Sequence, residues 1–117
     1  MSSERDLELV AGSVKPFDIY LYDENDVKEN LAAATRATFR VVAARGDTTY
    51  IIDIDTGAEV TIDSVNGRLV CQLTQVQADA LEEGTYIGQA TVEISSAWYY
   101  TDPFLVKVLD SIAPRLT

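Results

Sequence analysis

Few residues in this sequence have the types and spacing that chemistry requires. Asp53 and Asp55 are two positions apart, so in a strand both carboxylates point to the same side. Such a pair can serve hydrolysis, but on a short strand that faces water it indicates a solvated surface, which is the interpretation we prefer. The sequence contains no histidine, which removes the commonest general base and imidazole metal ligand. It also lacks phosphate-binding glycine motifs. We therefore expect a protein that is not an enzyme and needs no cofactor.

Two polar turns resemble binding motifs without completing them. Residues 23–26 and Glu29 offer oxygen ligands of the kind that bind Ca²⁺, but without the spacing of a dedicated calcium loop. A polar turn is the preferred interpretation, and cation binding stays open. Arg45-Gly46-Asp47 spells a tripeptide that some adhesive proteins present to integrins. Three residues occur together often by chance, and we assign them no role.

The single cysteine, Cys71, alternates with Leu69 and Leu73, which predicts a buried and unreactive thiol. A reactive thiol would need a base and a positive environment nearby, and the local sequence supplies neither. One cysteine also excludes a disulfide within the chain.

Aromatic residues are the strongest candidates for binding. Trp98 and Tyr100 alternate with Tyr99 near an expected hairpin, so at least one large ring should lie outside the core. Tyr20 and Tyr22 stand opposite the apolar residues of their own strand. Exposed rings concentrate binding energy at protein interfaces, but cross-strand packing on the surface is the more usual role of such rings. We take these five residues as interface candidates.

Composition narrows the classes of partner. The chain has 117 residues, of which 47% are apolar, so it can build one packed core. Its 19 acidic and 9 basic residues give a net charge of -10. Such a surface repels nucleic acid and anionic membranes, and we expect neither as a partner. The first residues lack the features of a signal peptide, and every apolar run is too short to span a membrane. We therefore expect synthesis in the cytoplasm.

Alternation of apolar and polar residues with period two dominates the chain and predicts strands. Leu7 with Leu9, and Val60 with Ile62, suggest two short strands, and residues 75–81 and 27–34 are the two segments that could be helical. The other apolar sets are Phe17, Ile19 and Leu21; Ala37, Phe39, Val41 and Ala43; Tyr50, Ile52 and Ile54; Leu69, Cys71 and Leu73; Tyr86, Gly88, Ala90, Val92 and Ile94; and Phe104, Val106 and Val108.

About seven to eight short strands separated by turns predict an all-β, immunoglobulin-like sandwich with one short helical turn. We expect a single domain over residues 1–117, with its core at about 7–110. Residues 1–6 would form an N-terminal arm and residues 111–117 a C-terminal tail.

The segment that ends in Tyr86 supports this fold class. In immunoglobulin-like sandwiches a tyrosine near the start of the sixth strand hydrogen-bonds back to the preceding loop. Here Leu81 would fill the core beneath the turn, Gly84 would permit the turn, and Tyr86 would supply ring and hydroxyl. The alternative is an ordinary turn followed by a tyrosine in a strand.

Three stretches together resemble one protein family. They are LAAATRATFRV at 31–41, VTIDSVNGRLV at 60–70 and LTQVQADALEEGTY at 73–86. In order and spacing they are similar to the N-terminal immunoglobulin-like domain of bacteriophage baseplate upper proteins and related short tail or head-surface proteins. Ala33-Ala34 stands where that family often has Gly-Ala, and no fibre or receptor-binding domain is appended.

The resemblance implies a non-enzymatic structural subunit of a phage particle, located in the virion. A free-standing domain fits a head decoration, connector or tail and baseplate surface protein that docks on other virion proteins, including copies of itself. The alternative is a module that binds carbohydrate or a host cell surface.

Overall fold

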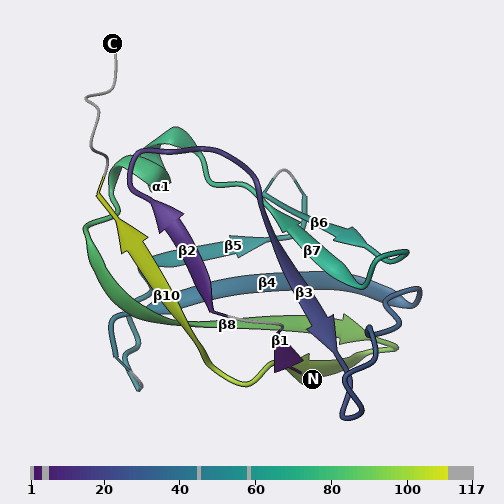
Figure 1. Ribbon diagram of the computed structural model, residues 1–117. Helices are drawn as coiled ribbons and strands as arrows, with labels where there is room; N and C mark the ends of the chain where they lie inside the picture. Colours follow the sequence, from purple (N-terminus) through teal and green to yellow (C-terminus); the bar gives the residue numbers. More distant parts are fainter. Residues whose placement is uncertain (1, 4–5, 45, 58, 111–117) are drawn as a thin grey trace.

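The structure is a computed structural model, and it describes residues 2–3, 6–44, 46–57 and 59–110. Strands dominate these ranges, and the one helix in them is short (Figure 1). The elements are β1 (Ser2–Ser3), β2 (Leu7–Val10), β3 (Phe17–Tyr22), β4 (Ala34–Val42), β5 (Ile52–Asp55), β6 (Val60–Asp63), β7 (Arg68–Cys71), α1 (Gln75–Asp79), β8 (Gly84–Ile94), β9 (Ala97–Tyr100) and β10 (Phe104–Leu109).

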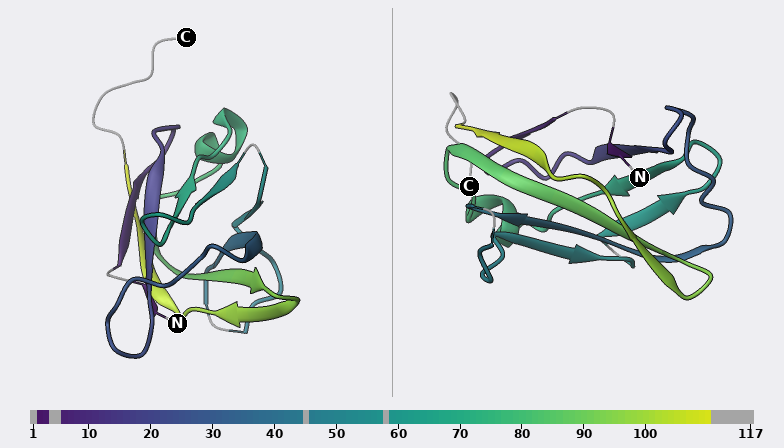
Figure 2. Two further views of the ribbon diagram at one scale, coloured as in Figure 1. Left: turned by 90° about the vertical axis from the view of Figure 1, so that its right-hand side faces the viewer. Right: turned by 90° about the horizontal axis from the view of Figure 1, so that it is seen from below.

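The strands form two sheets that pack face to face, so the fold is an immunoglobulin-like β-sandwich, as the alternation predicts. The four-stranded sheet has the order β1-β3-β7-β6, and the six-stranded sheet has the order β2-β10-β8-β4-β5, with β9 also paired to β8. Figure 2 shows the two sheets from two further sides, with β8 running along most of the molecule. The N-terminal segment contributes β1 to one sheet and β2 to the other, where β2 pairs parallel to β10.

The core lies between the sheets and consists of the alternating apolar residues of both. Phe39 is fully buried, stacks on Phe104 with ring centroids 6.1 Å apart, and meets Phe17 edge to face at 5.7 Å. Gly88 lies beneath these rings, and a Cβ there would approach a Val106 methyl to 2.6 Å. This close packing fixes β4, β8 and β10 against one another and so fixes the outer side of the six-stranded sheet.

The expected apolar sets are buried or are partly buried against the core, with two corrections. Ala43 follows the end of β4 and is exposed, and Tyr50 precedes β5 and is 45% exposed. The alternation continues past the ends of the strands, where the opposite sheet no longer covers the residues. Residues 27–34 are not helical: Lys28 forms a bridge to Tyr22, residues 32–33 form a turn, and Ala34 begins β4. The other expected helix is α1, whose N-terminus has a capping box formed by Thr74 and Gln77.

A tight hairpin joins β8 to β9. Ser95 and Ser96 have φ values of 51° and 67°, and positive φ at both central residues is the geometry that matches the twist of a two-residue hairpin. The strand then breaks before β10. Thr101 is buried there, and its hydroxyl accepts a hydrogen bond from the Ala90 amide at 3.1 Å. The side chain replaces part of the backbone ladder, so β9 stays attached to β8 across the break.

Before β8 the chain turns a corner that Tyr86 holds. Its hydroxyl donates a hydrogen bond to the Glu82 carbonyl at 2.7 Å, and Leu81 is buried beneath. This is the contact that defines a tyrosine corner. Gly84 is the first residue of β8. The three residues thus stabilise the fold and place no side chain in a binding surface.

Candidate functional site

The outer side of the six-stranded sheet brings together three kinds of side chain in parallel rows. We call this surface the aromatic face. Its rows are Asp53 and Asp55 on β5; Arg36, Thr38 and Arg40 on β4; Gln89, Thr91 and Glu93 on β8; and Trp98 and Tyr100 on β9, continued by Leu105 on β10. Alternation along each strand sends these residues outward because their neighbours fill the core.

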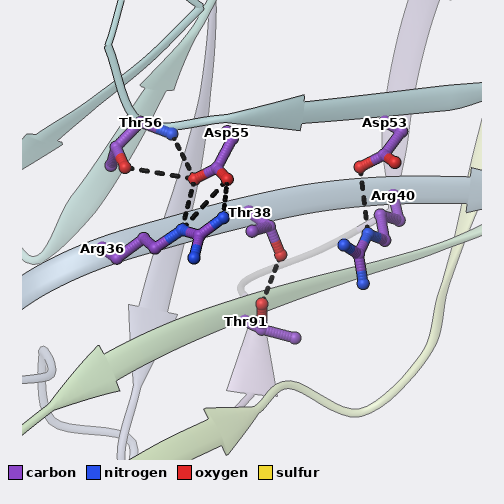
Figure 3. Close-up of polar contacts among 7 residues, drawn as sticks. All are labelled: Arg36, Thr38, Arg40, Asp53, Asp55, Thr56 and Thr91. Atoms are coloured by element: carbon purple, nitrogen blue, oxygen red, sulfur yellow. Dashed lines mark hydrogen bonds and ion pairs between the residues drawn. The ribbon is translucent and has the colours of Figure 1, made fainter. Parts of the chain in front are cut away.

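Two arginines on β4 pair with two aspartates on β5 (Figure 3). Arg36 Nε donates to both carboxylate oxygens of Asp55, at 3.1 and 3.0 Å, and Arg40 Nε donates to Asp53 at 3.0 Å. The hydrogen bond from Arg36 lowers the pKa of Asp55 to about 2, although partial burial opposes the shift. The pairs lie across adjacent strands, where opposite charges attract. Both carboxylates are bound to arginines, and that of Asp55 stays ionised to low pH, which does not suit acid–base catalysis.

A pair of buried hydroxyls lies among these charged residues. Thr38 and Thr91 are register partners on β4 and β8, and their hydroxyls are hydrogen-bonded to each other (Figure 3). Both are less than 10% exposed although they point away from the core. The larger side chains around them therefore form a closed layer over the middle of the sheet.

The apolar side chains of this layer are themselves exposed to solvent on their outer side. Trp98 is 39% exposed, Tyr100 60% and Leu105 50%. The Arg36 guanidinium lies 5.7 Å from the centre of the Trp98 ring, and the Arg40 guanidinium lies 5.0 Å from that of Tyr50. These cation–π contacts hold the rings against the sheet. Tyr50 was missed as a surface residue because the alternation of its segment assigned it to the core.

The five aromatic candidates do not form one surface. Trp98 and Tyr100 belong to the aromatic face. Tyr99 pairs with Val92 and points to the opposite side of β9, where it is still 47% exposed. Tyr20 and Tyr22 lie on the outer side of the four-stranded sheet, as the alternation of β3 requires. The structure therefore divides the candidates between two sheets and selects two of them for the aromatic face.

The remaining candidates for chemistry are buried in the core or belong to ordinary turns, or they lie outside the described residues. Cys71 is buried, and burial raises the pKa of its thiol to about 12. One Asp23 carboxylate oxygen accepts hydrogen bonds from the amides of Asn25 and Val27, which is ordinary turn geometry. Arg45 of the adhesive tripeptide lies outside the described residues, as do residues 111–117. Within the described ranges no three acidic, cysteine or histidine side chains gather where they could hold a metal ion.

A shallow groove of about 910 Å³ runs beside β2, β3 and β10. Acidic Asp6, Glu8 and Asp18 line it together with Phe17 and Lys107. Asp6 stabilises the fold, because its carboxylate accepts a hydrogen bond from the Leu105 amide at 3.1 Å. The groove therefore has no set of polar groups that converge on one ligand, and we assign it no function.

The architecture defines the class of protein as an immunoglobulin-like β-sandwich. Among solved structures with a matching fold is the crystal structure of CopC from Methylosinus trichosporium OB3b, with a TM-score of 0.50 and 10% sequence identity. The match covers 97% of this chain and 91% of that chain. No protein-family model and no curated protein matches the sequence. None of the helices in the described part of the chain is long and apolar enough to cross a membrane.

The comparison corrects the expected function. We expected a structural subunit of a phage particle, in a decoration, tail or baseplate position. The solved structure of CopC, which matches over most of both chains, points away from a phage structural role. The expectation was wrong because the stretches behind it describe features of the fold. They cover strand β4, the β6–β7 hairpin, and the capped helix with the tyrosine corner, which any immunoglobulin-like domain can use.

Proposed function

We propose that the protein is a non-enzymatic binding module that docks a protein partner on its aromatic face. The observation that supports this most is the exposed row of Trp98, Tyr100 and Leu105 on a sheet where Arg36 pairs with Asp55 and Arg40 with Asp53. Aromatic and arginine side chains at the centre of a surface are the usual sources of binding energy between proteins.

The electrostatics of this face favour docking. The whole chain carries a net charge of -10, yet Arg36 and Arg40 offset Asp53 and Asp55 here. A partner that covers these four residues does not bury an unpaired charge among them, which would otherwise cost several kcal/mol. The rings are also held by cation–π contacts, so little side-chain entropy is lost on binding.

A copper site does not fit the residues of this chain. Copper sites in proteins use imidazole, thiolate and thioether ligands. This sequence has no histidine, and its single thiol is buried with a raised pKa. The described residues offer no cluster of acidic or sulfur ligands in its place. The donor set does not fit the metal, and we derive no chemistry from it.

The test is photo-crosslinking from two matched positions. A photoreactive phenylalanine analogue is placed at Tyr100 on the aromatic face or at Tyr20 on the opposite sheet, in the cells that naturally make the protein. We expect a crosslinked protein from position 100 and none from position 20. Equal crosslinking from both positions, or none from position 100, would contradict the proposal.

The captured protein is then purified, and its affinity for the chain is measured by calorimetry. Burying the exposed part of Trp98, on the order of 100 Å² at about 25 cal/mol per Å², is worth about 2–3 kcal/mol. Trp98→Ala should therefore weaken binding by roughly 30–150-fold, and Tyr20→Ala should leave it unchanged. Unchanged affinity of a folded Trp98→Ala variant would also contradict the proposal.

A further inference from the structure

We infer that the partner on the aromatic face is a second copy of this chain, related by a two-fold axis. This inference rests on the proposed function and names the partner for the same surface. The axis runs parallel to the strands above the gap between β4 and β8. It places β4 of one copy over β8 of the other, and β5 over β9, because a rotation about this axis exchanges strands at equal distances from it.

The strand register shows that this arrangement is complementary row by row. Arg36 and Glu93 are partners across β4 and β8, so they lie at the same height along the axis. After rotation Arg36 of each copy faces Glu93 of the other, which gives two symmetric ion pairs. In the same way Arg40 faces Gln89, whose side-chain carbonyl can accept a hydrogen bond.

The outer rows match as well. Asp55, Thr38, Thr91 and Tyr100 lie at one height across the sheet. The Tyr100 hydroxyl of one copy therefore faces the Asp55 carboxylate of the other and can donate to it. Extending the β4–β5 register by two residues places Gly57 beside Arg36, at the height of Trp98. Around Gly57 the space where a side chain would be is open, so it leaves room for the Trp98 ring.

The size of the surface sets the expected affinity. Strands β4, β5, β8 and β9 have 9, 4, 11 and 4 residues, and at about 3.4 Å per residue and about 4.8 Å between strands they cover on the order of 450 Å² per copy. Stable complexes commonly bury about 800 Å² per partner. We therefore expect a weak dimer with a dissociation constant of about 1–100 μM. Repulsion between two chains of charge -10 is largely screened at 0.15 M salt, where the Debye length is about 8 Å.

The experiment measures sedimentation equilibrium of the purified chain from about 5 to 500 μM in 0.15 M salt. The wild-type chain should pass from monomer to dimer. Arg36→Glu and Glu93→Arg should each remain monomeric alone, because each places like charges opposite one another across the axis. An equimolar mixture of the two variants should dimerise again, because both contacts then join opposite charges. Lys15→Glu makes the same change of charge away from the face and should leave the dimer intact.

Circular dichroism of each variant establishes that it is folded. A wild-type chain that stays monomeric at 500 μM overturns the inference, and so does a mixture that stays monomeric when each variant is folded. A crosslink from position 100 to a different protein, together with a monomeric chain, also overturns it but leaves the proposed docking function intact. Crosslinks from position 100 to a second copy support both.

Discussion

On the outer sides of both sheets an arginine pairs with aspartate and lies against an aromatic ring, but the two arrangements have different roles. On the four-stranded sheet Arg68 Nε donates to Asp63 at 2.6 Å, Arg68 Nη1 donates to Asp18 at 2.8 Å, and its guanidinium lies 6.0 Å from the Tyr20 ring. On the aromatic face this arrangement occurs twice: Arg36 lies against Trp98, and Arg40 lies against Tyr50.

The two arrangements differ in how exposed each arginine is and in how many carboxylates it binds. The Arg68 side chain is 29% exposed and serves two carboxylates, whereas Arg36 and Arg40 are 53% and 44% exposed and each serves one. The Arg68 cluster is thus a self-contained clamp between β3, β6 and β7. The aromatic face keeps capacity to bind, because its arginines and rings still present unused surface. The same residue types therefore stabilise one sheet and offer a binding surface on the other.

The largest effect is expected from a substitution in the core that both sheets share. Phe39→Ala should lower the free energy of unfolding by about 3–5 kcal/mol, because it empties the fully buried space between Phe17 and Phe104. Urea denaturation followed by fluorescence measures the change. A loss below about 1 kcal/mol would show that the faces do not depend on a common core.

The buried hydroxyl pair is a feature of the aromatic face, and a double-mutant cycle tests it. Thr38→Val should cost about 1–3 kcal/mol, because it leaves the Thr91 hydroxyl buried without its partner. The double variant with Thr91→Val should recover most of this loss, since both polar groups are then gone. Additive losses from the two single changes would mean that the hydroxyls do not act as a pair.

The two arginine arrangements can be compared directly by matched changes. Arg68→Met should lower the urea midpoint more than Arg40→Met, because it leaves Asp18 and Asp63 as close like charges without their cation. Conversely, Arg40→Met should weaken docking while Arg68→Met should not. A smaller stability loss for Arg68→Met would reverse the assignment of clamp and binding surface.

The smallest expected effect is a dependence of the free energy of unfolding on pH, to which one aspartate on each sheet contributes. Hydrogen bonds from Arg36 lower the pKa of Asp55, and those from Asn66 and then Arg68 lower the pKa of Asp63, in each case from 3.8 to about 2. A lowered pKa in the folded state stabilises the fold above pH 4, and this contribution is lost as the pH falls from 4 towards 2.

Unfolding by urea at a series of pH values from 2 to 6 measures this slope. Asp55→Asn should flatten part of it, and Asp53→Asn, whose carboxylate accepts a single bond from Arg40, serves as the comparison on the same strand. A slope that is unchanged by Asp55→Asn would contradict the role of the Arg36 pair.

Much of the fold could be predicted from the sequence because its determinants are local. Alternation sets which side of a strand is buried, and the Leu81–Tyr86 segment carries its own corner contact. The aromatic face could be predicted only in part. Alternation placed Trp98 and Tyr100 together, but the pairing of Arg36 with Asp55 depends on the β4–β5 register, which the composition of either strand does not reveal. Tyr50 shows the same limit, since alternation cannot tell where the covering sheet ends.

The parallel pairing of β2 with β10 has a mechanical consequence. Leu7 is the register partner of Val106, and Val10 is that of Leu109, so the chain enters this ladder at one end and leaves it at the other (Figure 1). Tension applied through the two ends pulls β2 and β10 in opposite directions along their own axes. The hydrogen bonds between them then bear the load together in shear and do not open one after another. This geometry makes the β2–β10 pair resist stretching along the direction of its strands.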